Sequence, residues 1–255
     1  MTSEAHISHT TTTGWATERR LEIPVADRLV PAVVWTPPAG DAPPPLVLVG
    51  HGGGGHKRAP QVIDMAEGLA REHGIATLAI DGPANGDRPD NTEAARLLRD
   101  RDRVAYRRAY YESRYRHMVE DWRGALDAVR RLPDVGAGPV GYWGLSMGTR
   151  FGLPLVVAEP RIDAAVLGLF GLKAGTPGNR PVYDAAPRLS CPTLFLMQLD
   201  DEEVGRRPYL DLFDALGTRD KRIHANPGRH ARVPEDERRA SRRFLAERLT
   251  RATPR

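Results

Sequence analysis

The chain has a single cysteine, Cys191, and no apolar run long enough to cross a membrane. One cysteine cannot form an intramolecular disulfide, so nothing in the sequence requires an oxidising compartment. Residues 1–13 are polar and rich in threonine, and they lack the basic and apolar regions of a secretory signal. These absences predict a cytoplasmic protein without a membrane partner.

An excess of one charge is also lacking. The chain has 37 basic and 33 acidic residues among 255, a formal net charge of +4, and both signs are mixed along its length. Interspersed charges are typical of a solvated surface, so we expect no nucleic-acid partner. Hydrophobic residues make up 40%, enough for one large core. We expect a disordered leader over residues 1–16 and a single domain over residues 17–255.

Short apolar runs that alternate with helical patterns dominate the rest of the chain. All-apolar runs are typical of strands buried on both faces, and their alternation with helices predicts a mostly parallel sheet covered on both sides. Residues 18–25 and 30–35 suit an antiparallel pair at an edge, where Pro31 is tolerated. The predicted inner strands are residues 46–49, 75–80, 140–143, 164–169, 193–199 and 221–225, and helices are expected near residues 60–72 and 235–249.

Residues 91–132 form an unusual insertion. Apolar residues recur there at spacings of three, four and seven, which predicts one long helix or two helices that meet at a bend. The simpler interpretation is a helix that packs on the core with a charged outer face. Alternatively, residues 92–115 lean over the site as a partial cap. The side chains that would then contact substrate are Arg103, Tyr106, Arg107 and Tyr110.

The most informative motif is Gly-Leu-Ser-Met-Gly at residues 144–148, between an expected strand and a helical pattern. A serine hydroxyl becomes a useful nucleophile when a sharp strand-to-helix turn exposes it to a base. Glycines on either side remove side chains that would clash with the neighbouring strand and helix. Ser146 is therefore the candidate nucleophile, and Cys191, which precedes Pro192 and an apolar run, fits a buried structural thiol better.

Four consecutive glycines, residues 52–55, follow the strand at 46–49. Attack by a serine on a carbonyl creates an oxyanion, which needs N–H donors already aimed at it. The amide of Gly53 or Gly54 can supply one donor, and the amide of Met147 at a helix start can supply the other. A phosphate-binding loop is not favoured, because the glycines lack a following Lys-Ser or Lys-Thr pair.

The candidate base is His230, in a turn-rich stretch between the last strand and the last helix. His51 and His56 fit a role in bracing the glycine loop, and His224 lies inside the last strand. The acid is expected after the strand at 193–199, where residues 200–203 are all acidic. A buried carboxylate there would fix the tautomer of the imidazole.

The order of serine, acid and histidine on alternating strands and helices resembles the α/β-hydrolase superfamily, over about residues 30–249. Residues 33–37 and 45–52 look like the dienelactone-hydrolase and prolyl-oligopeptidase-like esterase branch, as does Cys-Pro-Thr-Leu at 191–194. That branch has an acid loop of the form G-x-x-D-x-x-V. Alignment with residues 198–204 makes Asp201 the acid, although Gln198 replaces the glycine and Asp200 remains an alternative.

The resemblance implies an α/β-hydrolase fold with a mostly parallel sheet of about eight strands and a helical insertion before the nucleophile strand. It also implies a serine esterase that cleaves small-molecule esters through an acyl-enzyme and needs no metal or organic cofactor. Dienelactone hydrolases proper use a cysteine where this chain has Ser146. Lactone opening, acyl transfer and a non-catalytic ligand-binding role remain alternatives.

Overall fold

The structure is a computed structural model that describes residues 5–40, 42–173 and 178–251. Its strands are β1 (His6–Thr12), β2 (Thr17–Val25), β3 (Arg28–Thr36), β4 (Leu46–Gly50), β5 (Ala76–Ile80), β6 (Val140–Leu145), β7 (Ile162–Gly168), β8 (Thr193–Gln198) and β9 (Lys221–Asn226). Its helices are α1 (Pro60–His73), α2 (Glu93–Arg101), α3 (Arg103–Tyr110), α4 (Tyr115–Val129), α5 (Met147–Ala158), α6 (Arg180–Ala185), α7 (Arg206–Ala215) and α8 (Glu235–Arg251).

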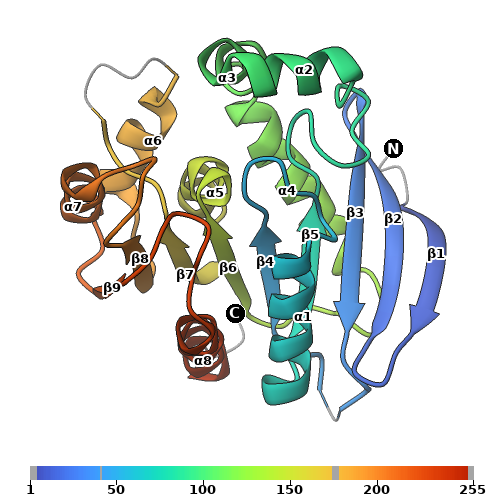
Figure 1. Ribbon diagram of the computed structural model, residues 1–255. Helices are drawn as coiled ribbons and strands as arrows, with labels where there is room; N and C mark the ends of the chain where they lie inside the picture. Colours follow the sequence, from blue (N-terminus) through green and yellow to red (C-terminus); the bar gives the residue numbers. More distant parts are fainter. Residues whose placement is uncertain (1–4, 41, 174–177, 252–255) are drawn as a thin grey trace.

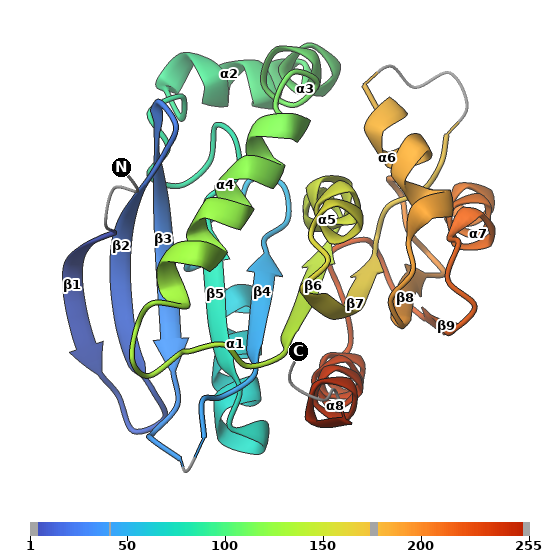
Figure 2. The same cartoon turned by 180° about the vertical axis from the view of Figure 1, so that it is seen from behind.

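All the strands join one nine-stranded sheet in the order β1-β2-β3-β5-β4-β6-β7-β8-β9. The first three strands are antiparallel, and the strands from β5 to β9 are parallel. Figure 1 shows α1 and α8 on one face of the sheet, and Figure 2 shows α4 and α5 on the other. Every residue of β4, β5 and β6 is buried, as expected for strands covered on both faces. The predicted fold class is confirmed.

The register of the central strands determines where the chemistry can lie. Gly50 at the end of β4 pairs with Gly144 near the end of β6. The glycine-rich turn and Ser146 therefore leave the sheet side by side, at the edge where parallel α/β sheets bind ligands. Both views place α2 and α3 beyond this same edge (Figures 1 and 2).

The N-terminal part of the chain differs from the expected disordered leader. Residues 6–12 form β1, which pairs with β2 and makes the ninth strand, so that prediction is wrong for this segment. Every side chain of β1 is exposed, so β1 is ordered by its backbone pairing with β2 and by surface contacts such as the hydrogen bond from the Ser8 hydroxyl to the Arg20 carbonyl at 3.3 Å, not by burial. Residues 1–4 lie outside the described residues.

The expected edge pair is internal instead, because β3 lies between β2 and β5. Pro31 is tolerated there because its carbonyl still accepts the amide of Asp81, just after β5, at 3.1 Å, while Arg88 Nε donates to the Asp81 carbonyl at 2.9 Å in place of the N–H that proline lacks.

The insertion is three helices rather than one or two. Asp102 ends α2 in an extended conformation, and its carboxylate caps α3 by accepting the amides of Val104 and Ala105. The prediction of a continuous apolar face that packs on the core is wrong for the part of the insertion before Tyr111. In that part, Leu97 is 63% exposed and Val104 is 69% exposed. None of the helices over the described ranges is both long enough and apolar enough to cross a bilayer.

Candidate active site

Ser146 occupies the sharp turn between β6 and α5. Its backbone has φ 57° and ψ −113°, and its amide donates to the carbonyl oxygen of Gly168 at 2.9 Å. A positive φ is uncommon for a residue other than glycine, and such strain concentrates at functional sites. The turn thus presents the Ser146 side chain beyond the edge of the sheet.

The neighbouring glycines allow this turn to pack closely. A Cβ atom on Gly148 would lie 2.5 Å from the carbonyl oxygen of Gly50, and one on Gly144 would lie 2.6 Å from the hydroxyl of Tyr142. Tyr142 also donates its hydroxyl to the carbonyl of Gly148 at 2.7 Å. These contacts confirm that both glycines are there to avoid clashes.

Thr149, which the sequence reasoning missed, ties the turn to the next strand. Its buried hydroxyl lies 2.8 Å from the carbonyl oxygen of Gly144 and 2.6 Å from that of Gly168, and it accepts the Gly168 amide at 2.7 Å. No local pattern reveals this role, because the carbonyl and amide of Gly168 lie on β7, which only the fold brings beside Thr149.

The three residues predicted as nucleophile, base and acid lie in one hydrogen-bonded chain. His230 Nε2 is 2.9 Å from Ser146 Oγ, and His230 Nδ1 is 2.7 Å from Asp201 Oδ2. The His230 side chain is 12% exposed, and that of Asp201 is fully buried at 0%. The hydrogen bonds therefore connect the Ser146 hydroxyl, through the His230 ring, to the Asp201 carboxylate, which is shielded from solvent.

Asp201 is held on both of its oxygen atoms. Oδ1 accepts the amides of Glu203 at 2.7 Å and Val204 at 3.0 Å, whereas Oδ2 accepts from His230 and from the hydroxyl of Tyr209. Burial opposes ionisation, but the hydrogen bonds from Tyr209, His230 and the two amides outweigh it and hold the pKa of Asp201 below its ordinary value. Tyr209 was missed by the sequence reasoning, because no local pattern links it to the acid.

The alternative residues have other partners. Asp200 accepts the amide of Gly228 at 2.9 Å. His224 contacts Glu237 at 2.9 Å, and the Nδ1 atom of His56 accepts the amide of Arg58 at 3.2 Å.

His51 braces the glycine loop, as expected. Its Nε2 accepts the amide of Gly82 at 2.8 Å, so Nδ1 carries the proton and donates it to the carbonyl of Gly52 at 2.8 Å. Burial lowers the pKa of His51 and keeps its imidazole neutral.

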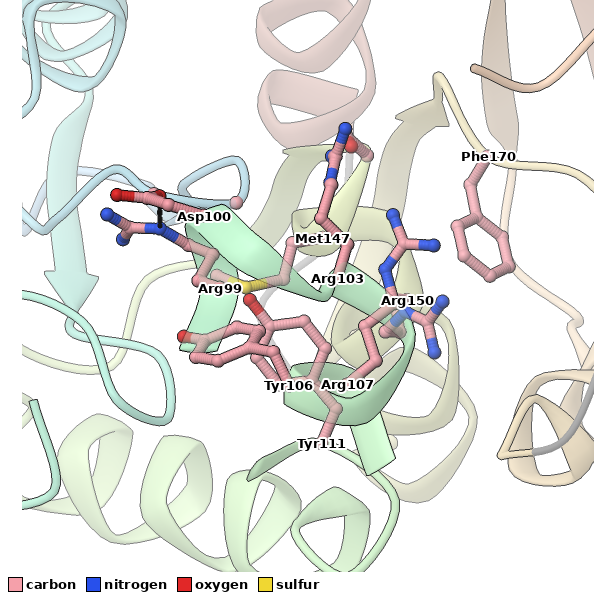
Figure 3. Close-up of a pocket in the computed structure, with 12 residues that line it drawn as sticks. Arg99, Asp100, Arg103, Tyr106, Arg107, Tyr111, Met147, Arg150 and Phe170 are labelled. Carbon is pink, nitrogen blue, oxygen red and sulfur yellow. Dashed lines mark hydrogen bonds and ion pairs between the residues drawn. The ribbon is translucent and has the colours of Figure 1, made fainter. Parts of the chain in front are cut away.

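Two cavities meet at Ser146 and Gly53. The first, of about 450 Å³, has a polar and aromatic wall that includes Arg107, Tyr111 and Arg150 (Figure 3). The second, of about 350 Å³, contains His230 and is bordered by apolar side chains such as Trp143. Met147 and Gly54 border the first cavity. Gly54 has φ +78°, and the amide of Gly55 closes the turn onto the carbonyl of Gly52 at 3.0 Å.

The insertion does form part of the site wall. Arg103, Tyr106 and Arg107 line the first cavity together with Ser146, in agreement with the cap alternative rather than with a purely solvated outer face. Tyr110 packs on the ring of Tyr106, with centroids 5.1 Å apart, and Tyr111 takes the place at the cavity that was expected of Tyr110.

Four other residues that line this cavity, Arg99, Asp100, Arg150 and Phe170, were not predicted. The loop at 171–187, which follows Phe170, contains α6, and its residues 174–177 lie outside the described part.

Cys191 and Ser146 lie at opposite ends of the parallel strands. Cys191 precedes the amino end of β8, whereas Ser146 follows the carboxyl end of β6. Burial raises the pKa of Cys191 to about 11, so the thiol stays protonated near neutral pH. Among the residues that the structure describes, no group of three or more His, Cys, Asp or Glu side chains could hold a metal ion.

A parallel sheet with an antiparallel start, helices on both faces and a serine at a strained strand-to-helix turn defines the α/β-hydrolase fold. No protein-family model matches the sequence, and no curated protein matches it significantly. Solved structures do match. A cold-adapted esterase from an Arctic intertidal metagenomic library is 35% identical, with a TM-score of 0.78 over 95% of this chain and 98% of that one. The chain therefore belongs to the same family of α/β-hydrolases as this esterase.

More distant structures share the fold. Acetyl xylan esterase 1 from Thermoanaerobacterium sp. is 18% identical, with a TM-score of 0.70 over 96% of this chain and 87% of that one. Dienelactone hydrolase from Anabaena variabilis is 21% identical, with a TM-score of 0.63 over 92% of this chain and 98% of that one.

Proposed function

We propose that this protein is a serine hydrolase that cleaves carboxylic esters of small molecules through an acyl-enzyme. The observation that carries the proposal is the contact of 2.9 Å between Ser146 Oγ and His230 Nε2, with the buried carboxylate of Asp201 behind the imidazole. Membership of a group that contains esterases supports ester hydrolysis as the reaction.

In the first half-reaction, Ser146 Oγ attacks the ester carbonyl carbon while His230 Nε2 takes the hydroxyl proton. Asp201 accepts a hydrogen bond from the Nδ1–H group, so Nε2 is left free as the base, and the negative charge of the carboxylate stabilises the imidazolium that forms. The carbonyl oxygen gains a negative charge and needs donors.

The amide of Met147 suits this role, because the first N–H groups of a helix have no partner within it. Of the two glycines considered for the second donor, Gly53 is favoured, since it borders both cavities that meet at Ser146.

The tetrahedral intermediate then collapses. The bond from carbon to the alcohol oxygen breaks, and His230 gives its proton to that oxygen. Water next attacks the acyl-enzyme, His230 takes a proton from the water, and Ser146 recovers its proton as the acid leaves. The net reaction is ester plus water to acid plus alcohol. Lactone opening and acyl transfer would use the same acyl-enzyme with an internal or a different alcohol.

Labelling with a fluorophosphonate probe and hydrolysis of p-nitrophenyl esters from acetate to decanoate test the proposal. Wild type should be labelled and active, and Ser146→Ala should lose the label and about 10⁴- to 10⁶-fold in turnover. Ser190→Ala, in an exposed serine outside both cavities, is the matched control and should behave as wild type. Equal labelling of Ser146→Ala and wild type would exclude Ser146 as nucleophile. Neither labelling nor turnover in wild type would favour the non-catalytic, ligand-binding alternative.

A further inference from the structure

Arg150 is a buried cation in the wall of the cavity that contains Ser146. It lies about one helical turn after Ser146 on α5 and is only 6% exposed. In the part of the chain that the structure describes, its guanidinium makes one hydrogen bond, from Nη1 to the hydroxyl of Tyr115 at 3.2 Å, and no ion pair. A guanidinium has five N–H donors, so most of those of Arg150 have no partner among the described residues.

Comparison with the other buried arginines makes this unusual. Arg88, 8% exposed, pairs with Asp121 at 2.7 Å, and Arg242, 3% exposed, pairs with Glu72 at 3.0 Å. Burial of a charge is costly unless a partner of opposite sign accompanies it. Over the described ranges, Arg150 is thus the one buried arginine without a carboxylate.

Aromatic rings hold this guanidinium in place. Its Cζ atom lies 5.0 Å from the ring centroid of Phe170 and 5.9 Å from that of Tyr111. Such contacts stabilise a cation without accepting its N–H groups in hydrogen bonds. Arg150 is therefore positioned, and its remaining donors are free to bind a ligand in the cavity that it lines.

A second cation, Arg107 of α3, shares this end of the cavity, and Figure 3 shows its guanidinium beside that of Arg150 on the side toward Phe170. Burial and the positive charges of Arg150 and Arg103 lower the pKa of Arg107. The nearest carboxylate, Glu203, is 4.0 Å from Arg107 but is already held by both Nη atoms of Arg103 at 3.1 and 3.0 Å. Two cations face this space with little compensating charge.

The two cavities can be assigned to the two halves of an ester. In the proposed reaction, His230 must reach the oxygen of the leaving alcohol, and His230 lines the second cavity. The alcohol therefore lies there, and the acyl group extends into the first cavity, toward Arg150. We infer that the physiological substrate carries a carboxylate on its acyl part, as in a monoester of a dicarboxylic acid, and that Arg150 and Arg107 bind this carboxylate. This inference rests on the proposed function.

Substrates matched in length separate the acyl side from the alcohol side. Monomethyl glutarate places a carboxylate at the end of the acyl chain, and methyl pentanoate replaces it with a methyl group. The ester 4-acetoxybutyrate carries the carboxylate on the alcohol, with butyl acetate as its neutral match. Hydrolysis is followed by proton release. Because charge-assisted hydrogen bonds are strong, we expect wild type to prefer monomethyl glutarate over methyl pentanoate by roughly tenfold to a hundredfold in kcat/KM. No comparable preference is expected for 4-acetoxybutyrate over butyl acetate.

Arg150→Met should reduce the acyl-side preference to near one, Arg107→Met should reduce it in part, and Arg150→Lys should retain some of it. Arg99→Met is the matched control, because Arg99 lines the same cavity but pairs with Asp100 at 3.2 Å, away from Phe170 (Figure 3). This variant should keep the wild-type preference. Thermal melting of each variant establishes that it is folded, and Arg107→Met, at a half-buried position, serves if Arg150→Met does not fold.

A binding measurement makes the inference independent of turnover. Glutarate, the acid product, should bind to Ser146→Ala in calorimetry and bind at least tenfold more weakly once Arg150→Met is added. Hydrolysis of methyl pentanoate that depends on Ser146, without a preference for monomethyl glutarate and without glutarate binding, would overturn the inference and leave the proposed function intact. Loss of Ser146 dependence would instead overturn the proposed function.

Discussion

Replacement of Asp201 by asparagine is the sharpest test of the hydrogen-bonded chain behind Ser146. The NH₂ group of the new side-chain amide cannot take the place of Oδ1 without facing two fixed backbone donors, the amides of Glu203 and Val204. At the place of Oδ2 it faces His230 and Tyr209, both of which can adjust. The NH₂ group should therefore point at His230 and donate to Nδ1.

This orientation changes the imidazole. If Nδ1 accepts a hydrogen bond, the proton of neutral His230 moves to Nε2, which then faces Ser146 as a donor and cannot take its proton. The carboxylate that would stabilise the imidazolium is lost as well. A comparable change in a serine protease costs about 10⁴ in turnover, equivalent to about 5.4 kcal/mol of activation free energy. We expect a loss of this order in kcat for a p-nitrophenyl ester, with little change in KM.

Asp200→Asn is the matched control, since it neutralises the adjacent carboxylate, which accepts the amide of Gly228 and does not contact His230. It should retain activity within about tenfold of wild type, because a single hydrogen bond is worth about 1 kcal/mol. Both variants should melt cooperatively. Activity of Asp201→Asn above a tenth of wild type, or a dead Asp200→Asn beside an active Asp201→Asn, would refute the assignment.

Other perturbations test the surroundings of this chain. Tyr209→Phe removes a hydrogen bond to Asp201 and keeps the ring, so kcat should fall by about tenfold at constant KM, and an unchanged kcat would contradict a positioning role. Gly148→Ala should lower the free energy of unfolding by about 1–3 kcal/mol, because its Cβ would clash with Gly50, whereas a denaturation midpoint equal to that of wild type would contradict this packing. The lowered pKa of His51 means that the unfolded state binds its proton first, so stability falls as pH drops below about 6.5, by up to about 1.4 kcal/mol per pH unit. His51→Gln should flatten this dependence in urea titrations between pH 7.5 and 5, and equal slopes would count against it.

The inner sheet could be predicted because its signal is local. A run such as residues 46–49 is apolar at every position, as a strand buried on both faces requires. β1 gave no such signal, since none of its side chains is buried and its order comes from backbone pairing with β2. Hydrophobic patterns in a sequence indicate which side chains are buried, so they do not predict a strand whose side chains are all exposed.

The site was predictable where the chain order carries the information. Ser146 and His230 follow strands whose ends meet at one edge, and the resemblance to the family's acid loop favoured Asp201 over Asp200. Tyr209 and Thr149 were not predictable, because each acts through a contact that only the packed fold creates.

The same limit applies to the insertion. Periodicity separates the apolar side of a helix from its polar side, but it does not tell whether the polar side faces solvent or a cavity. Arg107 faces the cavity of Ser146 from such a polar side. Arg150 has the opposite context, a charge within a helix whose neighbours are almost all buried. A buried helical charge without a carboxylate partner, as at Arg150 and unlike Arg242, is thus the stronger indication of a ligand site.

The two arginines have a further consequence for the proposed reaction. Their positive field acts on any negative charge that forms near Ser146, because both arginines line the same cavity as this serine. With a neutral ester, this field also favours the oxyanion. With an ester whose acyl group carries a carboxylate, the ligand neutralises the field, and the amides of Met147 and Gly53 are left to stabilise the oxyanion. The carboxylate therefore strengthens binding in the ground state and the transition state about equally, which lowers KM without raising kcat. This charge distribution therefore predicts that the preference for the charged ester appears as a lower KM. The preference should also weaken as added salt screens the arginines.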